Sequence, residues 1–559
     1  MEIQPIDSPV QIVRPTDNPF ANKVLPKVAR TQAGIEPYAG SWGVDQASHL
    51  LRRTMFGATK NDIQNIMALS LDQAVAQLLA DLPTPDPPVN TNALDIDVPV
   101  GQTWVVSPKT DSNGYNPNNS RTQSFKAWWI GLMLNQQVSL REKMTLFLHN
   151  HFVTETVDVS DARYVYKYNA LLRQFAFGNF KELAYQISVD PAMLKYLSGS
   201  TSTKTSPNEN YGRELQELFT IGKGPEISPG NYTTYTEDDV KAAAKVLTGW
   251  RDNSTNINSY FTLSRHDTTN KQFSSSYGNT VINGKTSATR PNEIDDLLTM
   301  IFAQPETARF FCRKLYTWFV YYLIDDTVEA NVIEPLANIL RTNNYEIKPV
   351  LTALFKSAHF YDPVNVGCII KNPIDHAVGV CRQFNIAFPA PTDVALQYTH
   401  WNYLRTQASN MQLNLGDPPN VAGWPSYYQI PQFYELWLNS DTLPKRNQLT
   451  DTLIGSGHKA SGYTIVIDPI AFADQVSDPT DPNILIDEFS QALFPFPITT
   501  NQKNFLKETL IPGLPDYEWT IEWTDYKANP TDQTKLTAVK TKLQQLLKFM
   551  IDMAEYQLM

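Results

Sequence analysis

Reactive side chains are most concentrated in the segment 207–222, which reads PNENYGRELQELFTIG. It carries three carboxylates, an arginine and an amide on one predicted helix that ends at Gly222. Glu214 and Glu217 are three residues apart, close enough to share a cation or a proton, and Arg213 can pair with Glu209 or Glu217. The competing interpretation is a solvated helix face whose ion pairs each contribute about 0.3–0.5 kcal/mol.

A second predicted helix places a histidine on an apolar stripe. Ser139 and Glu142 have the spacing of a capping box at its start. Helical spacing then aligns four side chains on one face: Met144, Phe147, Leu148 and His151. His151 is therefore either a core histidine bonded to a backbone carbonyl, or a general base or metal ligand with Asn150 orienting a neighbouring group. His149 lies about 200° away on the helix and cannot share its role.

A third group of polar residues follows a helix that begins near Thr236 and ends at Trp250. His266 and Asp267 stand in a polar stretch before Lys271, and we expect a hairpin around residues 277–279. A His-Asp pair in a loop is usually turn chemistry, so alone it is a weak indication of a site.

These segments resemble a known bacterial family, domain-of-unknown-function family 1800, in ordered blocks from about residue 50 to residue 424 and beyond. The blocks are residues 149–152 (HNHF), 208–219 (NENYGRELQELF), 235–240 (YTEDDV), 247–250 (LTGW), 266–271 (HDTTNK), 312–315 (CRKL) and 418–424 (PPNVAGW). The resemblance implies no established activity. Members of that family resemble exported proteins encoded beside secreted relatives of the alkaline phosphatase and sulfatase superfamily, which implies a two-protein system.

Composition favours a large globular protein and excludes some partners. The chain has 559 residues, 42% of them hydrophobic and 11% aromatic, which is enough for a sizeable core. Its net charge of -11 argues against a nucleic-acid partner, because a phosphate backbone is bound by basic surfaces. No run of about eighteen apolar residues predicts a membrane span. The three cysteines have no spacing typical of a zinc site or a disulfide framework.

The N-terminus lacks the basic and apolar regions of a signal peptide. This departs from the exported habit of the family that the chain resembles. Three explanations stay open: the protein remains in the cytoplasm, its leader has been removed, or it is exported with a partner. Localisation is therefore unassigned.

The predicted fold class is mainly α, an irregular multi-helix domain with a small β-hairpin insert and a smaller mixed C-terminal unit. We expect an extended N-terminal arm (1–40), a helical core (41–445) and a C-terminal α+β unit (446–559). The core contains a long loop (83–119), interpreted as a lid, a binding loop or a mobile segment, and a polar insert (251–290). The predicted helices include 140–153, 161–177, 180–197, 208–221, 293–302, 347–355 and 535–557, and a strand is predicted at 463–467.

Two functional hypotheses follow. In the first, a cleft gathers the catalytic candidates His151, Arg213, Glu214, Glu217, His266 and Asp267. Glu214, Glu217 and His151 are the candidates for holding a divalent metal in a hydrolase that acts on polysaccharide or another anionic substrate. Candidates for substrate binding are Asn150, Asn210, Trp250, Lys271 and Trp424, the last also explained as a wedge in the core.

In the second hypothesis the protein is an accessory partner or scaffold. The same polar residues then form a buried network that fixes helix packing, and the surface docks a sulfatase-like protein or a glycan. Burial of these groups by satisfied partners favours this hypothesis, and their convergence at an open cleft favours the enzyme.

Overall fold

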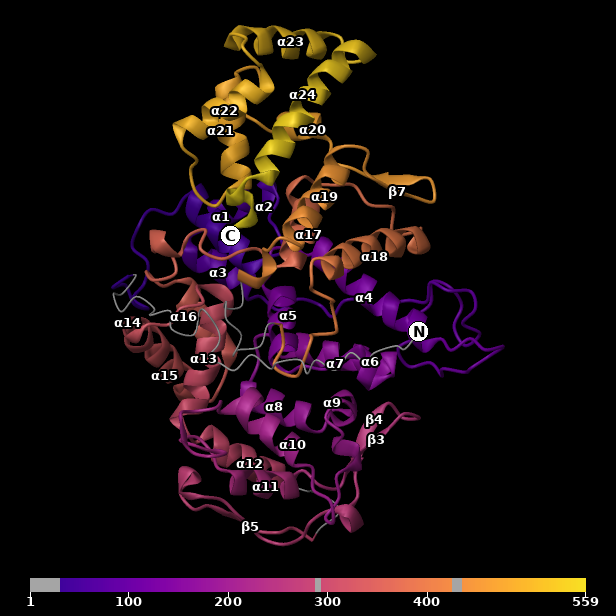
Figure 1. Cartoon of the computed structure of the whole chain (residues 1–559), viewed down its shortest axis with the longest axis vertical. Helices are drawn as coiled ribbons and strands as arrows, with labels where there is room; N and C mark the ends of the chain where they lie inside the picture. The colour runs from indigo at the N-terminus through magenta and orange to yellow at the C-terminus, as the bar shows by residue number, and fades with distance from the viewer. Residues whose placement is uncertain (1–30, 287–292, 425–434) are drawn as a thin grey trace, which may run out of the picture.

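The structure is a computed structural model that describes residues 31–286, 293–424 and 435–559. Helices make up most of its regular structure, with four two-stranded antiparallel sheets among the described residues. The predicted mainly α class is confirmed. Figure 1 shows an elongated molecule with the C-terminal helices at one end and the hairpins with α11 and α12 at the other.

The first third of the described chain supplies the helices at the centre of the molecule. They are α1 (Val44–Thr54), α2 (Lys60–Met67), α3 (Leu71–Leu78), α4 (Asn118–Leu134), α5 (Arg141–His151), α6 (Thr156–Val159), α7 (Ala162–Gln174), α8 (Phe180–Ser188) and α9 (Pro191–Tyr196). The predicted helix 180–197 is two helices, because Asp190 caps α9 and Pro191 opens it. The predicted helix 161–177 ends earlier, at Gln174.

The next section contains the acidic helix and the small sheets. These elements are α10 (Glu209–Glu214), the π-helical turn η3 (Leu215–Thr220), β1 (Glu226–Ser228), β2 (Asn231–Tyr232), α11 (Glu237–Val246), β3 (Trp250–Asn253), β4 (Asn258–Phe261), β5 (Lys271–Gln272) and β6 (Val281–Ile282). The predicted hairpin around 277–279 is the pair β5–β6, in which Lys271 faces Ile282. Gly278 and Asn279 at its tip have the left-handed backbone expected of a tight turn.

The remaining helices complete the core and the C-terminal end. They are α12 (Glu293–Phe302), α13 (Pro305–Phe319), α14 (Asp326–Val328), the π-helical turn η6 (Glu329–Ile333), α15 (Glu334–Thr342), α16 (Ile347–Phe355), α17 (Pro373–Gln383), α18 (Val394–Asn410), α19 (Thr442–Ile454), α20 (Pro469–Ala473), α21 (Pro482–Leu493), α22 (Thr500–Leu510), α23 (Asp516–Ala528) and α24 (Gln533–Asp552). The limits predicted for α12 and α16 are confirmed.

Short 3-10 turns and one further hairpin fill the connections. The turns are η2 (Gly199–Thr201), η4 (Leu263–Arg265), η5 (Ser275–Tyr277), η7 (Pro363–Asn365), η8 (Glu435–Trp437) and η9 (Ala554–Gln557), and the hairpin joins β7 (His458–Ala460) to β8 (Tyr463–Ile465). The strand predicted at 463–467 is thus β8, two residues shorter. The helix predicted at 535–557 is α24, which stops at Asp552.

A contiguous hydrophobic cluster runs through the molecule from Ala47 to Tyr556. Helices far apart in sequence pack side by side within it, notably α4 along α18 (Figure 1). The domain limits stay predictions, and most of the predicted N-terminal arm lies outside the described residues. Within the described chain, no helix combines the length and the hydropathy needed to cross a membrane.

Candidate functional site

The acidic helix changes its winding in the middle of the block 208–219. Asn208 caps α10 by accepting a hydrogen bond from the Tyr211 N–H at 3.0 Å. After Glu214 the chain forms the π-helical turn η3, in which the Ile221 N–H reaches the carbonyl of Gln216 at 3.0 Å. Gly222 ends the turn with a φ of +81°, as the sequence predicts. Single π-helical turns occur frequently at functional sites.

The bidentate partner of Arg213 differs from Glu209 and Glu217, the partners that the spacing predicted. Its guanidinium instead donates two hydrogen bonds to Glu237 at the start of α11, at 2.7 and 2.8 Å. These bonds hold the pKa of Glu237 below its ordinary value. A fork-to-fork pair between two helices fixes their relative position, which is a more specific contact than any pair within one helix. Arg213 therefore joins α10 to α11.

Glu217 is buried and bound from two sides. The Tyr235 hydroxyl donates to its carboxylate, and the Lys223 ammonium lies 3.6 Å from its other oxygen. Burial first, and then Glu217, raise the pKa of Tyr235, so the phenol stays protonated and acts as a donor. Glu217 is thus held by protein groups rather than left open for a ligand.

Glu214 differs from its neighbours. Its side chain is only partly buried, and no hydrogen bond or ion pair to it is found among the described residues. Burial, followed by the negative charge of Glu217, raises the pKa of Glu214 to about 7. A carboxyl group that is half protonated near neutral pH can act as a general acid or base. Of the predicted catalytic residues, Glu214 alone combines partial exposure with a carboxyl that no described residue binds.

His151 lies in the aromatic core. Its Nε2 donates to the Phe219 carbonyl at 3.0 Å, while Nδ1 is buried without a partner among the described residues. Five phenylalanine rings surround the imidazole with centroids 4.5–6.3 Å away: Phe147, Phe152, Phe180, Phe310 and Phe311. Burial and the nearby Lys314 lower its pKa well below the ordinary value, so the ring is neutral. His151 therefore meets the backbone of η3 instead of the Glu214 and Glu217 carboxylates.

The expected capping box before His151 is absent. Helix α5 begins at Arg141 and lacks the side-chain cap that the capping box predicted. The Ser139 Oγ instead accepts a hydrogen bond from the Arg141 N–H at 3.2 Å. Glu142 points away to the interior, where it accepts from Arg173 at 2.7 Å and from the Trp129 indole at 3.0 Å. A buried arginine partner outcompetes the cap because it satisfies the carboxylate's full charge.

Asn150 and Trp424 fix the loop that follows α18. The Asn150 side-chain oxygen accepts from the Trp424 N–H at 2.7 Å. Gly423, with a φ of +97°, allows this approach, since a Cβ there would lie 2.4 Å from the same oxygen. The Trp424 side chain is buried in the hydrophobic cluster, so its ring has no open face for a sugar. Both residues have a structural explanation: one anchors a backbone and the other fills the core.

His266, Asp267 and Lys271 belong to a sealed polar network. His266 binds the Thr248 carbonyl through Nδ1 at 2.9 Å and Glu293 through Nε2 at 3.1 Å. Lys271 lies 2.6 Å from the other Glu293 oxygen and also donates to the Asp267 carbonyl. All four side chains are buried. Burial alone would raise the pKa of Glu293. Hydrogen bonds from His266 and Lys271 outweigh that effect and hold the pKa of Glu293 below its ordinary value.

Glu293 and Lys314 bind groups of these networks, and Asp417 forms a further ion pair; the sequence predicted none of the three. Asp417 binds Lys126 and accepts from the Thr156 N–H and hydroxyl, both at 2.7 Å. Lys314 donates to the Leu218 carbonyl at 3.3 Å, and burial lowers its pKa to about 8. Lys314 lies within the block 312–315, one of the blocks that resemble the family. Glu293 and Asp417 have no sequence feature that predicts their partners, other than being acidic residues at the boundary of an element.

We name these connected groups the motif core: α5, α10 with η3, α11, and the network of His266, Lys271 and Glu293. The two other candidates lie at its edge. Asn210 is exposed on α10, and Trp250 is half-buried in β3 with its ring 5.6 Å from Phe261. Within the described ranges, no three His, Cys, Asp or Glu side chains are grouped as a metal ion requires.

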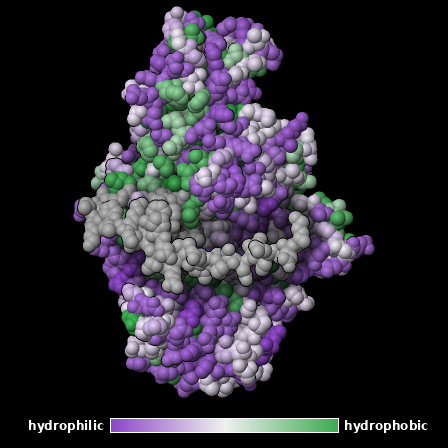
Figure 2. All heavy atoms as spheres, viewed as in Figure 1, coloured by the Kyte–Doolittle hydropathy of each residue, from purple (hydrophilic) through white to green (hydrophobic). Residues whose placement is uncertain are grey.

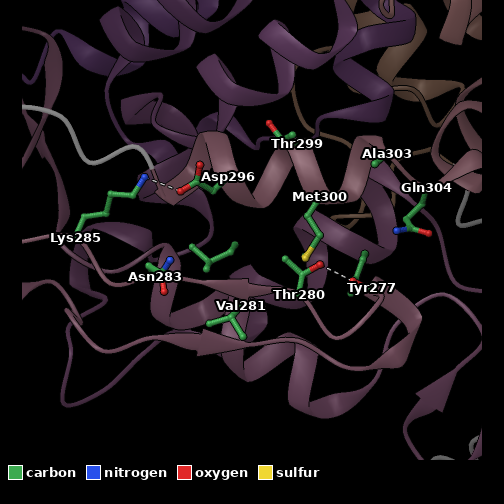
Figure 3. Close-up of a pocket in the computed structure, with 11 residues that line it drawn as sticks. Tyr277, Thr280, Val281, Asn283, Lys285, Asp296, Thr299, Met300, Ala303 and Gln304 are labelled. Carbon is green, nitrogen blue, oxygen red and sulfur yellow. Dashed lines mark hydrogen bonds and ion pairs between the residues drawn. The ribbon is translucent and has the colours of Figure 1, made fainter.

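A cavity of about 490 Å³ adjoins the motif core without entering it. Figure 3 shows side chains of the β5–β6 hairpin facing those of α12 across this space. Lys285 and Asp296 in its wall pair with each other at 2.6 Å, and Tyr277 donates to Gln216 at 2.9 Å behind it. None of its lining residues is a predicted site residue.

The 83–117 loop, which projects beside α4, has an ordered interior. Arg121 binds the buried Asp95 through two bonds of 2.7 and 2.9 Å. Trp104 is fully buried and donates to Ser124 at 3.1 Å. Asn90 closes the loop on itself by donating to the Val98 carbonyl at 2.6 Å. These bonds hold the loop in one conformation.

The outer side of the same loop carries exposed aliphatic side chains among exposed polar ones such as Gln102 and Asp111. Four aliphatic side chains are exposed there: Leu94 (62%), Ile96 (64%), Val100 (48%) and Val106 (76%). Leu94 and Ile96 flank Asp95, and the two aliphatic side chains are exposed while the acid is buried. Figure 2 shows hydrophobic atoms mixed with hydrophilic ones on this projection, which Figure 1 draws in indigo and purple.

Comparison with known families agrees with the ordered blocks. The model described as "Protein of unknown function (DUF1800)" matches residues 49–558. The chain belongs to the DUF1800 family. The match spans the motif core, the 83–117 loop and the C-terminal helices, so all three are parts of the DUF1800 region. Neither curated proteins nor solved structures gave a match to the chain.

Proposed function

We propose that this DUF1800 protein is an accessory docking protein of an exported polysaccharide-processing system, and that its partner is a sulfatase-like protein. The observation that carries the proposal is the 83–117 loop, an ordered projection with four exposed aliphatic side chains. Exposed apolar side chains gathered on one rigid element are typical of protein interfaces, because burying them in a complex removes apolar area from water.

Order within the loop supports binding rather than accident. A flexible segment would lose conformational entropy on association, whereas a loop already held by Arg121, Asp95 and Trp104 loses little. The exposed Leu94 and Ile96 are short, stiff side chains, which keeps that loss small.

The state of the motif core supports the same proposal. Arg213 is bound to Glu237, Glu217 to Tyr235, and His266 and Lys271 to Glu293. Groups that are already bound to protein partners cannot also bind a substrate without breaking those bonds. We therefore assign these groups to packing of the helices, where a satisfied polar network also specifies one arrangement.

The test is sedimentation velocity of the chain mixed with a secreted sulfatase-like protein, the class of partner that the family resemblance implies. We expect a complex of defined stoichiometry. Changing Leu94→Asp and Ile96→Asp together is expected to weaken it about tenfold or more, since two charges would have to be buried. Ile227→Asp is the matched control, because Ile227 is equally exposed on β1, outside the loop. Absence of a complex, or equal loss in the control, would contradict the proposal.

A second candidate function is hydrolysis with Glu214 as general acid, favoured by its partly exposed carboxyl with a pKa of about 7. The assay is release of reducing ends from heparan sulfate and chondroitin sulfate, as representatives of anionic polysaccharides. If this candidate is right, Glu214→Gln lowers the rate by about a hundredfold or more while Glu209→Gln, an exposed change on the same helix, does not. No release by the unchanged protein from either substrate would remove it.

A further inference from the structure

A second cavity, of about 410 Å³, lies where the C-terminal helices meet the first two helices of the core. Its walls come from α1, α2, α17, α20 and α21, which lie near one another in Figure 1 although they are far apart in sequence. Figure 2 shows hydrophobic atoms at the surface in this region. A volume of this size, formed between parts of a chain, is in the range of small-molecule sites.

The depth of the cavity is apolar. Phe472, Phe489 and Leu493 form its inner wall and are buried, with Ala58 beside them. Met67 lines the mouth and is 41% exposed, so the cavity opens to solvent there. Such a wall offers dispersion contacts and a hydrophobic driving force to a hydrocarbon chain or ring, but no partner for a buried charge.

The mouth of the cavity carries charges that cancel. Lys60 lies 3.3 Å from Glu488 and also donates to the Gln475 carbonyl. Glu488 accepts in addition from the Ser477 N–H at 3.1 Å. A ligand with a carboxylate or an ammonium group would have to break this pair to be neutralised. Four further lining residues have neutral amide side chains: Gln64, Gln383, Gln475 and Gln491.

Ser48 adds a polar position at one side of the cavity. It is buried, and its hydroxyl has no hydrogen-bond partner among the described residues. It also lines a neighbouring cavity of about 270 Å³ beside Arg52 and Lys503, so it stands where the two spaces meet. A ligand with a hydroxyl or amide group is chemically matched to such a position, and a pure hydrocarbon is not.

We propose that the cavity between α1–α2 and α20–α21 binds an uncharged amphiphile, with its hydrocarbon part against Phe472, Phe489 and Leu493 and its polar end among the neutral groups of the mouth. This site is separate from the docking loop and from Glu214. It would let a lipid-like or acyl-chain molecule associate with the protein at the junction of the core and the C-terminal helices.

The test uses the full chain and N-phenyl-1-naphthylamine, an uncharged probe whose fluorescence rises in apolar surroundings. We expect one probe per chain and displacement by 1-hexanol, 1-octanol and 1-decanol, with affinity rising about fourfold per added methylene until the cavity is filled. Decanoate and decylammonium are expected to bind roughly tenfold or more weakly than 1-decanol, because each must be desolvated beside an existing ion pair. No probe binding, or decanoate binding as tightly as 1-decanol, would overturn the proposal.

Two variants locate the binding. Ala492→Phe on α21 fills the cavity and is expected to weaken 1-octanol binding about tenfold or more. Ala471→Phe on α20 is the matched control, since Ala471 is exposed and does not line the cavity. If Ala492→Phe unfolds, as circular dichroism would show, Met67→Trp at the exposed mouth gives the same answer with less strain. Equal affinity in the filled variant and the control would place the probe elsewhere and refute the site.

Discussion

The motif core and the 83–117 loop arrange polar and apolar groups in opposite ways. In the motif core, Lys271 and Glu293 are buried and bound to each other while apolar helices enclose them. In the loop, the Arg121–Asp95 pair forms the interior and the aliphatic Leu94 and Ile96 face water. Buried ion pairs stabilise the conformation of both regions, but only the loop has aliphatic side chains exposed to solvent. The difference teaches that the most chemically rich sequence need not be the surface that meets a ligand.

The largest effect that would break this comparison is expected in the motif core. Lys271→Met leaves Glu293 buried with His266 as its remaining side-chain partner. We expect a loss of about 3–5 kcal/mol in the free energy of unfolding, measured by urea titration, because one charge of a buried pair is left uncompensated. Lys241→Met is the control: its pair with Asp238 is exposed, and we expect no more than about 0.5 kcal/mol. Equal, small losses in both variants would show that the network is not structural.

A smaller and more local effect is expected in the loop. Arg121→Met leaves Asp95 without its two bonds from the guanidinium. The loop is expected to open with its protection against hydrogen exchange lowered by about 2–3 kcal/mol, while α10 and α11 keep theirs. Loss of protection across the whole molecule would mean that the loop is part of the core and not a separately ordered projection.

The pH dependence of Glu214 sharpens the comparison within the motif core. Its folded pKa of about 7 lies above the ordinary 4.5, so between these values the folded state keeps a proton that the unfolded state has released. The contribution of this group to the free energy of unfolding therefore falls as pH rises from 4.5 to 7. Above pH 7 the full loss of stability is reached.

Glu214→Gln removes that cost because the amide does not ionise. We expect the variant to be more stable than the unchanged protein by roughly 1–2 kcal/mol at pH 8, allowing for solvent screening, and equally stable at pH 4. Glu209→Gln on the exposed side of α10 is expected to show no such dependence. A variant that is less stable at pH 8 would contradict the raised pKa and imply that Glu214 is bound by a cation.

The smallest effect on stability is expected where the effect on binding is largest. Changing Leu94→Asp together with Ile96→Asp should alter the free energy of unfolding by less than about 0.5 kcal/mol, since both side chains already face water. Thermal and urea unfolding of the isolated protein provide the measurement. A loss of several kcal/mol would show that these side chains are packed against the protein, and would contradict the proposal that they form an exposed docking surface.

Much of the fold follows from local sequence. Helix limits such as those of α12 and α16 are readable because apolar periodicity and flanking polar residues agree. Asp190 followed by Pro191 is also a pattern that predicts the start of a helix. The apolar periodicity continues across these residues, so one helix was predicted where there are two. The helices α20 to α23 were missed, since the prediction expected a mixed α+β unit and took its evidence from the strand at 463–467.

The candidate site was less predictable because its contacts join distant segments. Spacing along α10 suggested Arg213 with Glu209 or Glu217, yet the true partner is Glu237, which the sequence places beyond two short strands. His151 was correctly placed on an apolar stripe, and its bond to the Phe219 carbonyl is the structural alternative that was stated with it. The winding of η3 and the partner Glu293 carry no local signal, since both depend on tertiary packing.

The deciding measurement is hydrogen exchange of the chain alone and in the presence of the proposed partner, a sulfatase-like protein. The account predicts that amides of residues 90–106 gain protection in the complex while those of Glu209–Thr220 stay unchanged. Protection gained around Glu214, with the loop unaffected, would contradict it and would return the motif core to the position of the functional site.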